Sequence, residues 1–259
     1  MIIENHMNSH TQLVGIIGWS VTHSLSPLMH NAAFAHLNLN WSYVPLAVAP
    51  NLLPQAIAGL AALSFRAANV TIPHKRAALA CVDEVSDEAH IIGAINTIIV
   101  DKNGRTRGEN TDARGFLADL DEKQIDPTQH DVTILGAGGS ARAILYALLK
   151  SGCTKIHIVN RNEKRAQELI QDFAHHFSAA NLTLNPSPQS GEGLLINCTP
   201  PQNPFPYTSG ISYDLSYNNP RAQTATFSGI GMLIQQGALS FKMWTGQKAP
   251  LDVMASALK

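Results

Sequence analysis

The segment from Val132 to Ile144, VTILGAGGSARAI, restricts the possible fold more than any other part of the sequence. An apolar run typical of a strand leads into Gly136, Gly138 and Ala141, and a helical pattern follows at once. Glycines at a strand–helix turn permit a tight turn and close approach of the backbone to a pyrophosphate, which binds at the helix N-terminus. The pattern alone could be a structural turn. A second strand-like run, KIHIV, begins about twenty residues later, so the segment predicts a dinucleotide-binding βαβ unit.

Strand-like and helix-like segments alternate along the chain, and this alternation predicts an α/β protein. In the first half, LVGIIG is followed by SPLMHNAAFAHLN, and WSYVPLAV is followed by NLLPQAIAGLAAL. Such alternation with short connections is typical of a parallel sheet. Asn103-Gly104 lies between two extended runs and predicts a hairpin, so we expect an antiparallel pair at the edge of this sheet. We expect the polar stretch NLTLNPSPQSGEG, in the second half, to be a loop.

Composition and charge exclude several classes of protein. The 259 residues carry a net charge of −1, which gives no electrostatic reason to bind nucleic acid or an anionic membrane. The three cysteines form no CxxC motif, which argues against a zinc site or a disulfide framework and favours a reducing compartment. No metal site is expected at His23 and His30, because Pro27 between them breaks the helical spacing.

Two segments raise the question of targeting or membrane insertion. Residues 1–10 contain an acid and lack the basic region of a signal peptide, so we expect a short disordered tail there. The apolar segment 44–65 is interrupted by three prolines. It therefore predicts a strand followed by a helix, and not a membrane span.

The end of the second strand of the βαβ unit bears on which dinucleotide binds. An NAD site usually has an acidic residue there, which binds the ribose hydroxyls. This chain has Asn160 and Arg161 at that position, followed by Lys164 and Arg165. A guanidinium can bind a phosphate through paired hydrogen bonds, so these cations favour NADP over NAD. Glu163 opposes this interpretation, and the cations could instead be solvated residues at the start of a helix.

Lys75 and Asp112 are the candidates for chemistry, because each lies at the predicted start of a helix. Lys75 follows Pro73 in NVTIPHK, and proline favours the first turn of a helix. A cation is poorly placed at a helix N-terminus, unless its pKa is to be lowered or a carboxylate lies opposite. Asp112 in GENTD offers that carboxylate. Alone, Asp112 could be a plain N-cap and Lys75 a solvated lysine; together, after strands of one sheet, they indicate a shared cleft.

The stretch HSLSPLMHN places several hydrogen-bonding side chains directly after the first strand. We expect Ser26 to be the N-cap and Pro27 the first residue of a helix that runs toward Leu37. The hydroxyls of Ser24 and Ser26, with the backbone N–H groups of the helix start, would suit a carboxylate. The alternative is that Ser26 caps the helix and binds no ligand.

A series of motifs resembles the shikimate dehydrogenase family: HSLSPLMHN, NVTIPHK, GAINT, GENTD, GAGGSARA, NRNEKRA, INCTP, YDLSYNNP and GMLIQQGALSFKMWTG, in this order. The match extends over nearly the whole chain from Thr11 onward. The resemblance implies an enzyme of aromatic amino acid biosynthesis that reduces 3-dehydroshikimate to shikimate, reversibly, with NADPH. It also implies an α/β fold with a substrate domain, residues 11–112 plus 233–259, whose sheet is mostly parallel. Residues 113–232 would form a Rossmann-type NADP-binding domain.

The resemblance implies a role for each matched residue. Lys75 and Asp112 would be the catalytic pair, with the proton donor left open between them. Substrate contacts would come from Ser24, Ser26, Thr71, Asn96, Tyr217 and Gln236. The cofactor contacts expected from the glycine motif and from the resemblance together are Gly136, Ala137, Gly138, Gly139, Ser140, Ala141, Asn160, Arg161, Lys164, Arg165, Thr199, Leu215, Gly229, Met232 and Asp87.

The chain departs from the family pattern at a few positions. Ser20 replaces a usual proline, and Asn162 replaces a usual threonine but is still able to hydrogen-bond phosphate. Between Tyr217 and Gly231 the chain looks too short for the further helix and strand of the family. Because of this shortening, the motifs do not fix where the cofactor domain ends. The roles expected of residues 229 and 232 depend on that boundary.

Three other functions remain open at this point. The nearest is a quinate/shikimate dehydrogenase that uses NAD. The second is a non-catalytic ligand-binding regulator on the same scaffold, and the third is a folate-linked dehydrogenase of similar architecture. For every enzyme reading we expect a cytoplasmic protein, a monomer or homodimer, whose partner is a small-molecule substrate.

Overall fold

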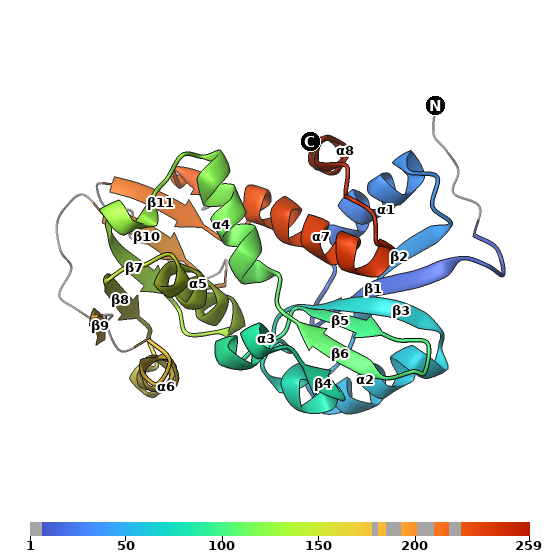
Figure 1. The fold of residues 1–259 in the computed structure, drawn as a ribbon, viewed down its shortest axis with the longest axis horizontal. Coiled ribbons are helices and arrows are strands. Elements are labelled where there is room, and N and C mark those ends of the chain that lie inside the picture. Colours follow the sequence, from blue (N-terminus) through green and yellow to red (C-terminus); the bar gives the residue numbers. More distant parts are fainter. Residues whose placement is uncertain (1–6, 178–180, 185–192, 201–209, 218–223) are drawn as a thin grey trace. The chain divides into compact units, whose positions relative to one another are not determined.

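The structure, a computed structural model, describes residues 7–177, 181–184, 193–200, 210–217 and 224–259. The chain divides into two compact units: Met1–Thr111 with Ile234–Lys259, and Asp112–Leu233. We call them the first and the second unit. Each has its own six-stranded sheet with helices around it, which makes the protein an α/β fold with two largely parallel sheets (Figure 1).

The sheet of the first unit has the strand order β2-β1-β3-β5-β6-β4. Its strands are β1 (Gln12–Gly18), β2 (Trp41–Ala47), β3 (Phe65–Val70), β4 (Glu84–Val85), β5 (Thr97–Val100) and β6 (Thr106–Glu109). β1 pairs in parallel with β2 and β3, and β4 with β6. β5 is antiparallel to both of its neighbours, with Asn69 opposite Thr97 and Thr97 opposite Glu109. The sheet is therefore mostly parallel, as the sequence predicts.

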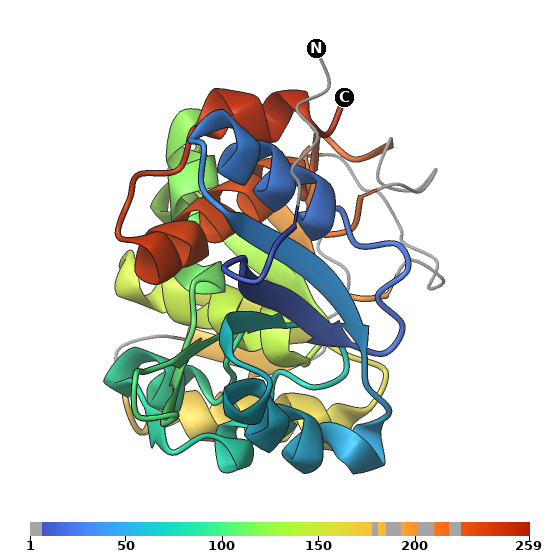
Figure 2. The same ribbon diagram turned by 90° about the vertical axis from the view of Figure 1, so that its right-hand side faces the viewer.

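Helices cover both faces of this sheet. They are α1 (Ser26–His36), α2 (Leu53–Ala62), α3 (Asp87–Ile92), most of α7 (Ile230–Thr245) and α8 (Leu251–Ser256), with the short 3-10 helices η1 (Pro50–Leu52) and η2 (Ala77–Cys81). α1 and α7 lie on one side of the strands and α2 on the other, in both views (Figures 1 and 2). The strand and helix expected in the apolar segment 44–65 are thus β2 and α2.

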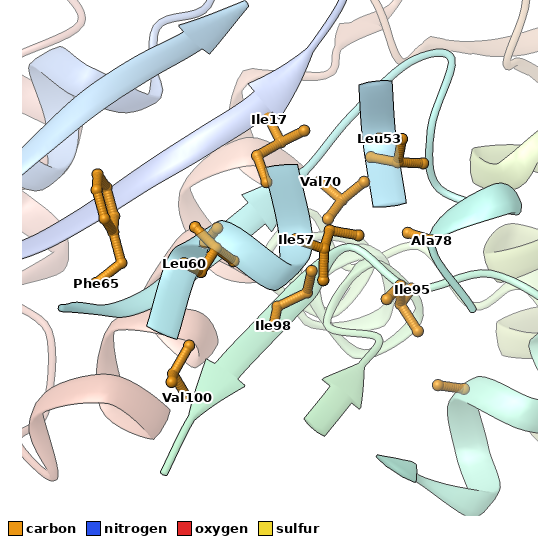
Figure 3. Close-up of a cluster of buried hydrophobic side chains, with 12 residues drawn as sticks. Ile17, Leu53, Ile57, Leu60, Phe65, Val70, Ala78, Ile95, Ile98 and Val100 are labelled. Carbon is orange, nitrogen blue, oxygen red and sulfur yellow. The ribbon is translucent and has the colours of Figure 1, made fainter. Parts of the chain in front are cut away.

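The core on the α2 side is aliphatic (Figure 3). Leu53, Ile57 and Leu60 are buried and lie at helical spacing, so one face of α2 packs on the sheet. Their neighbours in the sheet include Ile17 and Val70. Burial of each large aliphatic side chain stabilises the fold by about 1.5–3 kcal/mol relative to exposure. This packing fixes the strand ends from which the candidate site residues extend.

The sheet of the second unit is entirely parallel, with the strand order β9-β8-β7-β10-β11-β12. Numbered within the unit, this order is 3-2-1-4-5-6, the order of Rossmann dinucleotide-binding folds. Its strands are β7 (Asp131–Leu135), β8 (Lys155–Val159), β9 (Asn181–Leu184), β10 (Gly193–Asn197), β11 (Gly210–Asp214) and β12 (Phe227–Ser228). Its helices are α4 (Asp112–Glu122), α5 (Gly139–Lys150) and α6 (Glu163–Ala174), with η3 (Pro127–Gln129) before β7.

Two strand predictions are wrong. The stretch expected to be a loop begins with β9, whose four residues pair in parallel with β8. The segment expected to be too short for both a helix and a strand contains the two-residue strand β12, and its residues 218–223 lie outside the described residues. The hairpin predicted at Asn103-Gly104 joins β5 and β6, but it does not lie at the sheet edge, because the two-residue strand β4 pairs outside β6. All three strands are too short to give a periodic pattern.

Two predictions at helix starts are also wrong. Leu25, and not Ser26, is the N-cap of α1, since the Ser24 hydroxyl already accepts a hydrogen bond from the Ser26 N–H at 3.3 Å. No α-helix begins at Pro73; only the 3-10 helix η2 follows. The Lys75 carbonyl accepts its hydrogen bond from the Ile95 N–H at 2.9 Å, which draws this backbone toward the sheet and out of a helical path.

The N-terminal residues differ from expectation as well. Residues 1–6 lie outside the described residues. The next four do not fit a disordered tail, because they form a turn in which the Thr11 N–H donates to the Asn8 carbonyl at 3.0 Å. The Thr11 hydroxyl donates in turn to Asn40 at 2.7 Å. Among the described helices, none is both long and apolar enough to cross a membrane.

Candidate functional site

The candidate substrate residues of the first unit follow strands that end at one edge of the sheet. β1 and β3 are parallel, and β3 and β6 are both antiparallel to β5, so all three strands have their carboxyl ends at the same edge. Ser24 and Ser26 follow β1, and Thr71 and Lys75 follow β3; Asp112 follows β6 along the chain and is the first residue of the second unit. Asp112 is the first residue of α4, as predicted, where a carboxylate interacts favourably with the helix dipole.

The end of β1 fixes the position of Thr71. The Thr71 N–H donates to the Ile17 carbonyl at 2.9 Å. A Cβ added to Gly18 would lie 2.5 Å from the Thr71 side chain, so only glycine fits at the end of this strand. Ser26 is buried at 4% exposure and Ser24 is half-buried. The two serines and the threonine therefore lie on short segments tied to neighbouring strand ends.

Lys75 lies half-buried in a turn. The His74 N–H closes this turn on the Thr71 carbonyl at 2.9 Å, and the His74 ring bonds to the Val48 carbonyl at 2.8 Å. The next segment, Ile95–Asn96, binds the Lys75 carbonyl on one side and the Val70 N–H on the other. The backbone at Lys75 is thus held by both β3 and the segment that leads into β5.

A buried network of polar side chains surrounds Asn96. Asn96 is 2% exposed, and its carboxamide bonds to Thr111 and to Gln236 of α7. Thr97 and Ser240 complete this part of the network. The sequence motifs GAINT and GENTD contain both threonines, but Ser240 carries no recognisable signal. The sequence motifs point to Asn96 and Gln236 as candidates but not to the residues that hold them.

The glycine turn of the second unit has the geometry that a dinucleotide requires. Gly136 has φ +109°, a conformation that favours glycine, and an added Cβ would lie 3.4 Å from the Cys198 backbone. Gly138 is the N-cap of α5, and a Cβ added there would meet no atom within 4 Å. The helix start is therefore open to a pyrophosphate, which its backbone N–H groups can bind. The residues present fit the cofactor that the sequence predicts.

The segment after β8 carries the cations expected at the ribose. Arg161, Lys164 and Arg165 are all exposed at the start of α6. The Asn162 side chain accepts a hydrogen bond from the Arg165 N–H at 3.2 Å and so caps α6. The Asn160 side chain donates to the Asn162 carbonyl at 2.7 Å. The turn is thus fixed by the two asparagines, and the Asn162 oxygen is already used as a cap.

Two buried residues that the sequence analysis missed shape the ends of β10 and β11. The Asn197 side chain donates to the Asp214 carboxylate at 3.1 Å and accepts from the Thr199 hydroxyl at 2.7 Å. Asp214 accepts from the Ser216 N–H at 2.9 Å. Asn197 is the last residue of β10 and Asp214 the last residue of β11, and both lie within the family motifs. Both are fully buried, which the sequence could not reveal. The pair positions the loop that carries Thr199 and the loop that carries Leu215.

Gly229 directly follows β12 and packs against the backbone of Leu215, which directly follows β11. An added Cβ would be 2.2 Å from the Leu215 carbonyl oxygen, so no side chain fits. Because the sheet is entirely parallel, these positions lie with Gly136 and Asn160 at one edge, where Rossmann folds bind ligands.

A buried cluster holds the start of α7, which carries Met232. The Tyr213 hydroxyl donates to the Asp119 carboxylate and accepts from the Met232 N–H. Burial, and then the Asp119 charge, raise the pKa of Tyr213 well above its usual value, so the phenol keeps its proton. Lys123 forms an ion pair with Asp119. A Cβ at Gly231 would collide with the same carboxylate.

Tyr217 also lies in the second unit. Burial, followed by the charge of Asp112, raises the pKa of Tyr217. Asp87, the weakest of the cofactor candidates, is exposed in the first turn of α3 and belongs to the first unit.

The fold and these two edges define a class of protein. A parallel sheet in Rossmann order, with an open glycine turn, belongs to a dinucleotide-binding α/β protein. The accompanying α/β unit carries a lysine and buried carboxamides at its own strand ends. Comparison with known proteins then narrows the class to a family.

Three family models match the chain. The shikimate dehydrogenase substrate binding domain matches residues 16–98, the shikimate / quinate 5-dehydrogenase model residues 119–204, and the shikimate 5'-dehydrogenase C-terminal domain residues 229–259. The shikimate dehydrogenase (NADP(+)) of Carboxydothermus hydrogenoformans is 41% identical, with 97% of this chain and 98% of that protein covered. The chain belongs to the shikimate dehydrogenase family.

Solved structures agree with this membership. A shikimate dehydrogenase in complex with NADP+ superimposes with a TM-score of 0.86 at 34% identity, over 98% of this chain and 96% of the other. The Thermus thermophilus shikimate 5-dehydrogenase in complex with NADP(H) and shikimate gives a TM-score of 0.82 at 35% identity, over 95% and 98% of the two chains.

Proposed function

We propose that this protein catalyses the reversible, NADP-dependent interconversion of 3-dehydroshikimate and shikimate, in the pathway to aromatic amino acids. The observation that carries the proposal is the full-length similarity to NADP(+)-dependent shikimate dehydrogenases, at 41% identity over nearly all of both chains. The glycine turn and the strand-end residues of both units support it, because several of the family motifs follow the carboxyl end of a strand, which is where α/β folds bind ligands.

On the substrate side, Ser24 and Ser26 bind the carboxylate of the ring acid, with Tyr217 at the same end. Thr71, Asn96 and Gln236 bind the ring hydroxyls. Buried carboxamides suit this role, because their neighbours hold each of them in a fixed orientation toward a polar partner.

Lys75 and Asp112 form the catalytic pair. A nicotinamide held by the cofactor residues would supply the hydride transfer, in either direction. The Lys75 ammonium lies beside the substrate oxygen, where it stabilises developing negative charge or donates the proton that makes the alcohol. Asp112 orients Lys75 and accepts a hydrogen bond from the substrate hydroxyl. The pH–rate profiles of variants at the two positions would identify the group that transfers the proton.

On the cofactor side, the residues from Gly136 to Ala141 bind the pyrophosphate at the start of α5. Arg161, Lys164 and Arg165 bind the 2′-phosphate, and their exposure leaves them accessible to it; Asn160 is a further cofactor contact in the same turn. Thr199, Leu215, Gly229 and Met232 line the nicotinamide end, and Asp87 contributes from the first unit. We further propose a cytoplasmic enzyme, monomeric or homodimeric.

A spectrophotometric assay tests this function. Purified protein is mixed with shikimate and NADP, and the absorbance of reduced nicotinamide is followed. We expect the highest kcat/KM for this pair, above shikimate with NAD and above quinate with either cofactor. Higher kcat/KM with quinate and NAD would instead indicate a quinate/shikimate dehydrogenase, and shikimate binding without turnover would indicate a regulator.

A further inference from the structure

The buried network around Asn96 has a feature that goes beyond the contacts proposed above. Its hydrogen bonds to backbone N–H groups and between carboxamides have a direction that the partner dictates, whereas the contacts of Ser240 with Thr97 and Thr111 can run either way. We propose that Thr97 and Ser240 are positioning residues, which fix the carboxamides of Asn96 and Gln236 so that Gln236 presents its NH2 group to the substrate. This inference rests on the proposed function, and it specifies that Gln236 is the hydrogen-bond donor in its contact with the substrate.

The orientation of the Asn96 carboxamide follows from a backbone group. The Thr111 N–H, which can only donate, lies 2.8 Å from Asn96 Oδ1. The NH2 group of Asn96 must therefore point the other way, toward the Thr111 hydroxyl at 2.9 Å and toward Gln236 at 3.2 Å. Asn96 is buried, so water cannot compensate for a reversed orientation.

The orientation of Gln236 follows from that of Asn96. The Asn96 NH2 can only donate, so the Gln236 atom that faces it must be the oxygen, Oε1. The Thr111 hydroxyl lies 3.4 Å from the same oxygen and 3.2 Å from Asn96 Oδ1, and its single proton can be donated to either of them. The Nε2 group of Gln236 is consequently turned away from Asn96. A substrate oxygen that contacts Gln236 on that side must act as an acceptor.

Thr97 holds Asn96 through its hydroxyl group, which donates to Asn96 and accepts from Asn69. The Asn69 side chain donates to the Asn96 carbonyl at 3.0 Å, and its oxygen accepts from the Tyr43 hydroxyl at 2.8 Å. The Asn69 NH2 therefore faces the Thr97 hydroxyl, at 3.1 Å, which must accept. The Thr97 proton is left to donate to Asn96 Oδ1 at 3.0 Å.

Ser240 ties this arrangement to α7. It lies one turn after Gln236, is fully buried, and contacts the hydroxyls of Thr97 at 2.9 Å and Thr111 at 3.2 Å. Its own hydroxyl is 3.2 Å from the Gln236 carbonyl. Ser240 thus fixes the helix turn that carries Gln236 relative to the sheet that carries Asn96.

A pair of substitutions at one position tests the proposal. Thr97→Val keeps the shape but removes the hydroxyl, and Thr97→Ser keeps the hydroxyl. We expect Thr97→Val to raise the KM for shikimate about tenfold with an unchanged KM for NADP, and Thr97→Ser to remain within about twofold of the wild type. A purely structural threonine would show the reverse pattern, a lowered melting temperature with an unchanged KM.

Thr106→Val is the matched control. Thr106 is a buried threonine of the same hairpin, and its hydroxyl bonds to Asp83, away from Asn96 and Gln236. We expect it to lower the melting temperature without changing the KM for shikimate. Gln236→Glu tests the polarity itself, because a carboxylate still accepts from Asn96 but cannot donate to the substrate. We expect it to raise the KM for shikimate more than tenfold, on the scale of a lost hydrogen bond with added repulsion.

Each outcome is decisive. A wild-type protein that does not oxidise shikimate would refute the proposed function, and with it this inference. An active wild type combined with an unchanged KM in Thr97→Val, or with equal losses in Thr97→Val and Thr97→Ser, would refute the inference alone. If Thr97→Val does not fold, Ser240→Ala provides the test, with an expected threefold or so rise in the KM for shikimate; an unchanged KM there would equally overturn the proposal.

Discussion

Buried His30 makes the stability of the first unit depend on pH. The imidazole of α1 is fully buried and stacks on Tyr43, with ring centroids 4.6 Å apart, and lies 5.0 Å from the Trp244 ring. Neither ring nitrogen has a hydrogen-bond partner among the described residues. Burial therefore lowers the pKa of His30 from 6.5 to about 3.

The sign of the effect follows from this lowered pKa. The folded protein keeps His30 neutral, whereas the unfolded chain protonates it below pH 6.5. Stability is therefore fully present above the unfolded pKa and is lost as the pH falls from 6.5 toward 3. Between pH 7 and pH 5 the loss amounts to about 2 kcal/mol, from integration of proton uptake over this interval.

Urea unfolding at the two pH values measures this contribution. All three tryptophans, Trp19, Trp41 and Trp244, lie in the first unit, so their fluorescence follows the unfolding of the part that contains His30. We expect His30→Phe, which cannot take up a proton, to reduce the pH dependence of the unfolding free energy by about 2 kcal/mol. Because the quantity is a difference between two pH values, the packing cost of the larger ring cancels.

Phe34→Leu is the control for this experiment. Phe34 packs in the same aromatic cluster, against Phe241 at 5.2 Å, and carries no titratable group. Its substitution should lower stability equally at both pH values. If wild type and His30→Phe show the same pH dependence, the reasoning about a neutral, buried imidazole is refuted.

Three further predictions concern the second unit. Arg161→Gln should raise the KM for NADP about tenfold and leave the KM for NAD nearly unchanged, as steady-state kinetics with the two cofactors would detect. Tyr213→Phe should destabilise the protein by about 1–3 kcal/mol in urea unfolding, because it leaves the buried N–H of Met232 without its acceptor. Gly229→Ala should abolish soluble expression or lower the melting temperature strongly, since the added methyl group would collide with the Leu215 carbonyl.

The sequence was sufficient to predict the two sheets and most of the strand ends that carry the candidate site residues. Long apolar strands such as β1 and β7 alternate with amphipathic helices, and this pattern indicates parallel sheets from local information alone. The glycine turn likewise depends on neighbouring residues, so its position at the start of α5 was predictable. The short strands β4, β9 and β12 form only because they pair with a neighbouring strand. Such pairing cannot be predicted from the local sequence pattern.

The residues that hold the site were not predictable for a related reason. Ser240 bonds to Asn69 although 171 residues separate them, and Tyr213 bonds to Asp119 across 94 residues. Such contacts arise only after both segments have packed. Lys75 illustrates the converse error: local proline chemistry suggested a helix start, but the hydrogen bond from Ile95 determines the backbone there.

The central claim is that the strand-end edge bearing Lys75 carries out the chemistry. The most direct test measures the turnover of Lys75→Ala with shikimate and NADP, together with its affinity for shikimate from tryptophan fluorescence. The account predicts a fall in kcat of about a hundredfold to ten-thousandfold, with shikimate affinity changed only a few-fold. A variant that retains wild-type turnover would contradict the account.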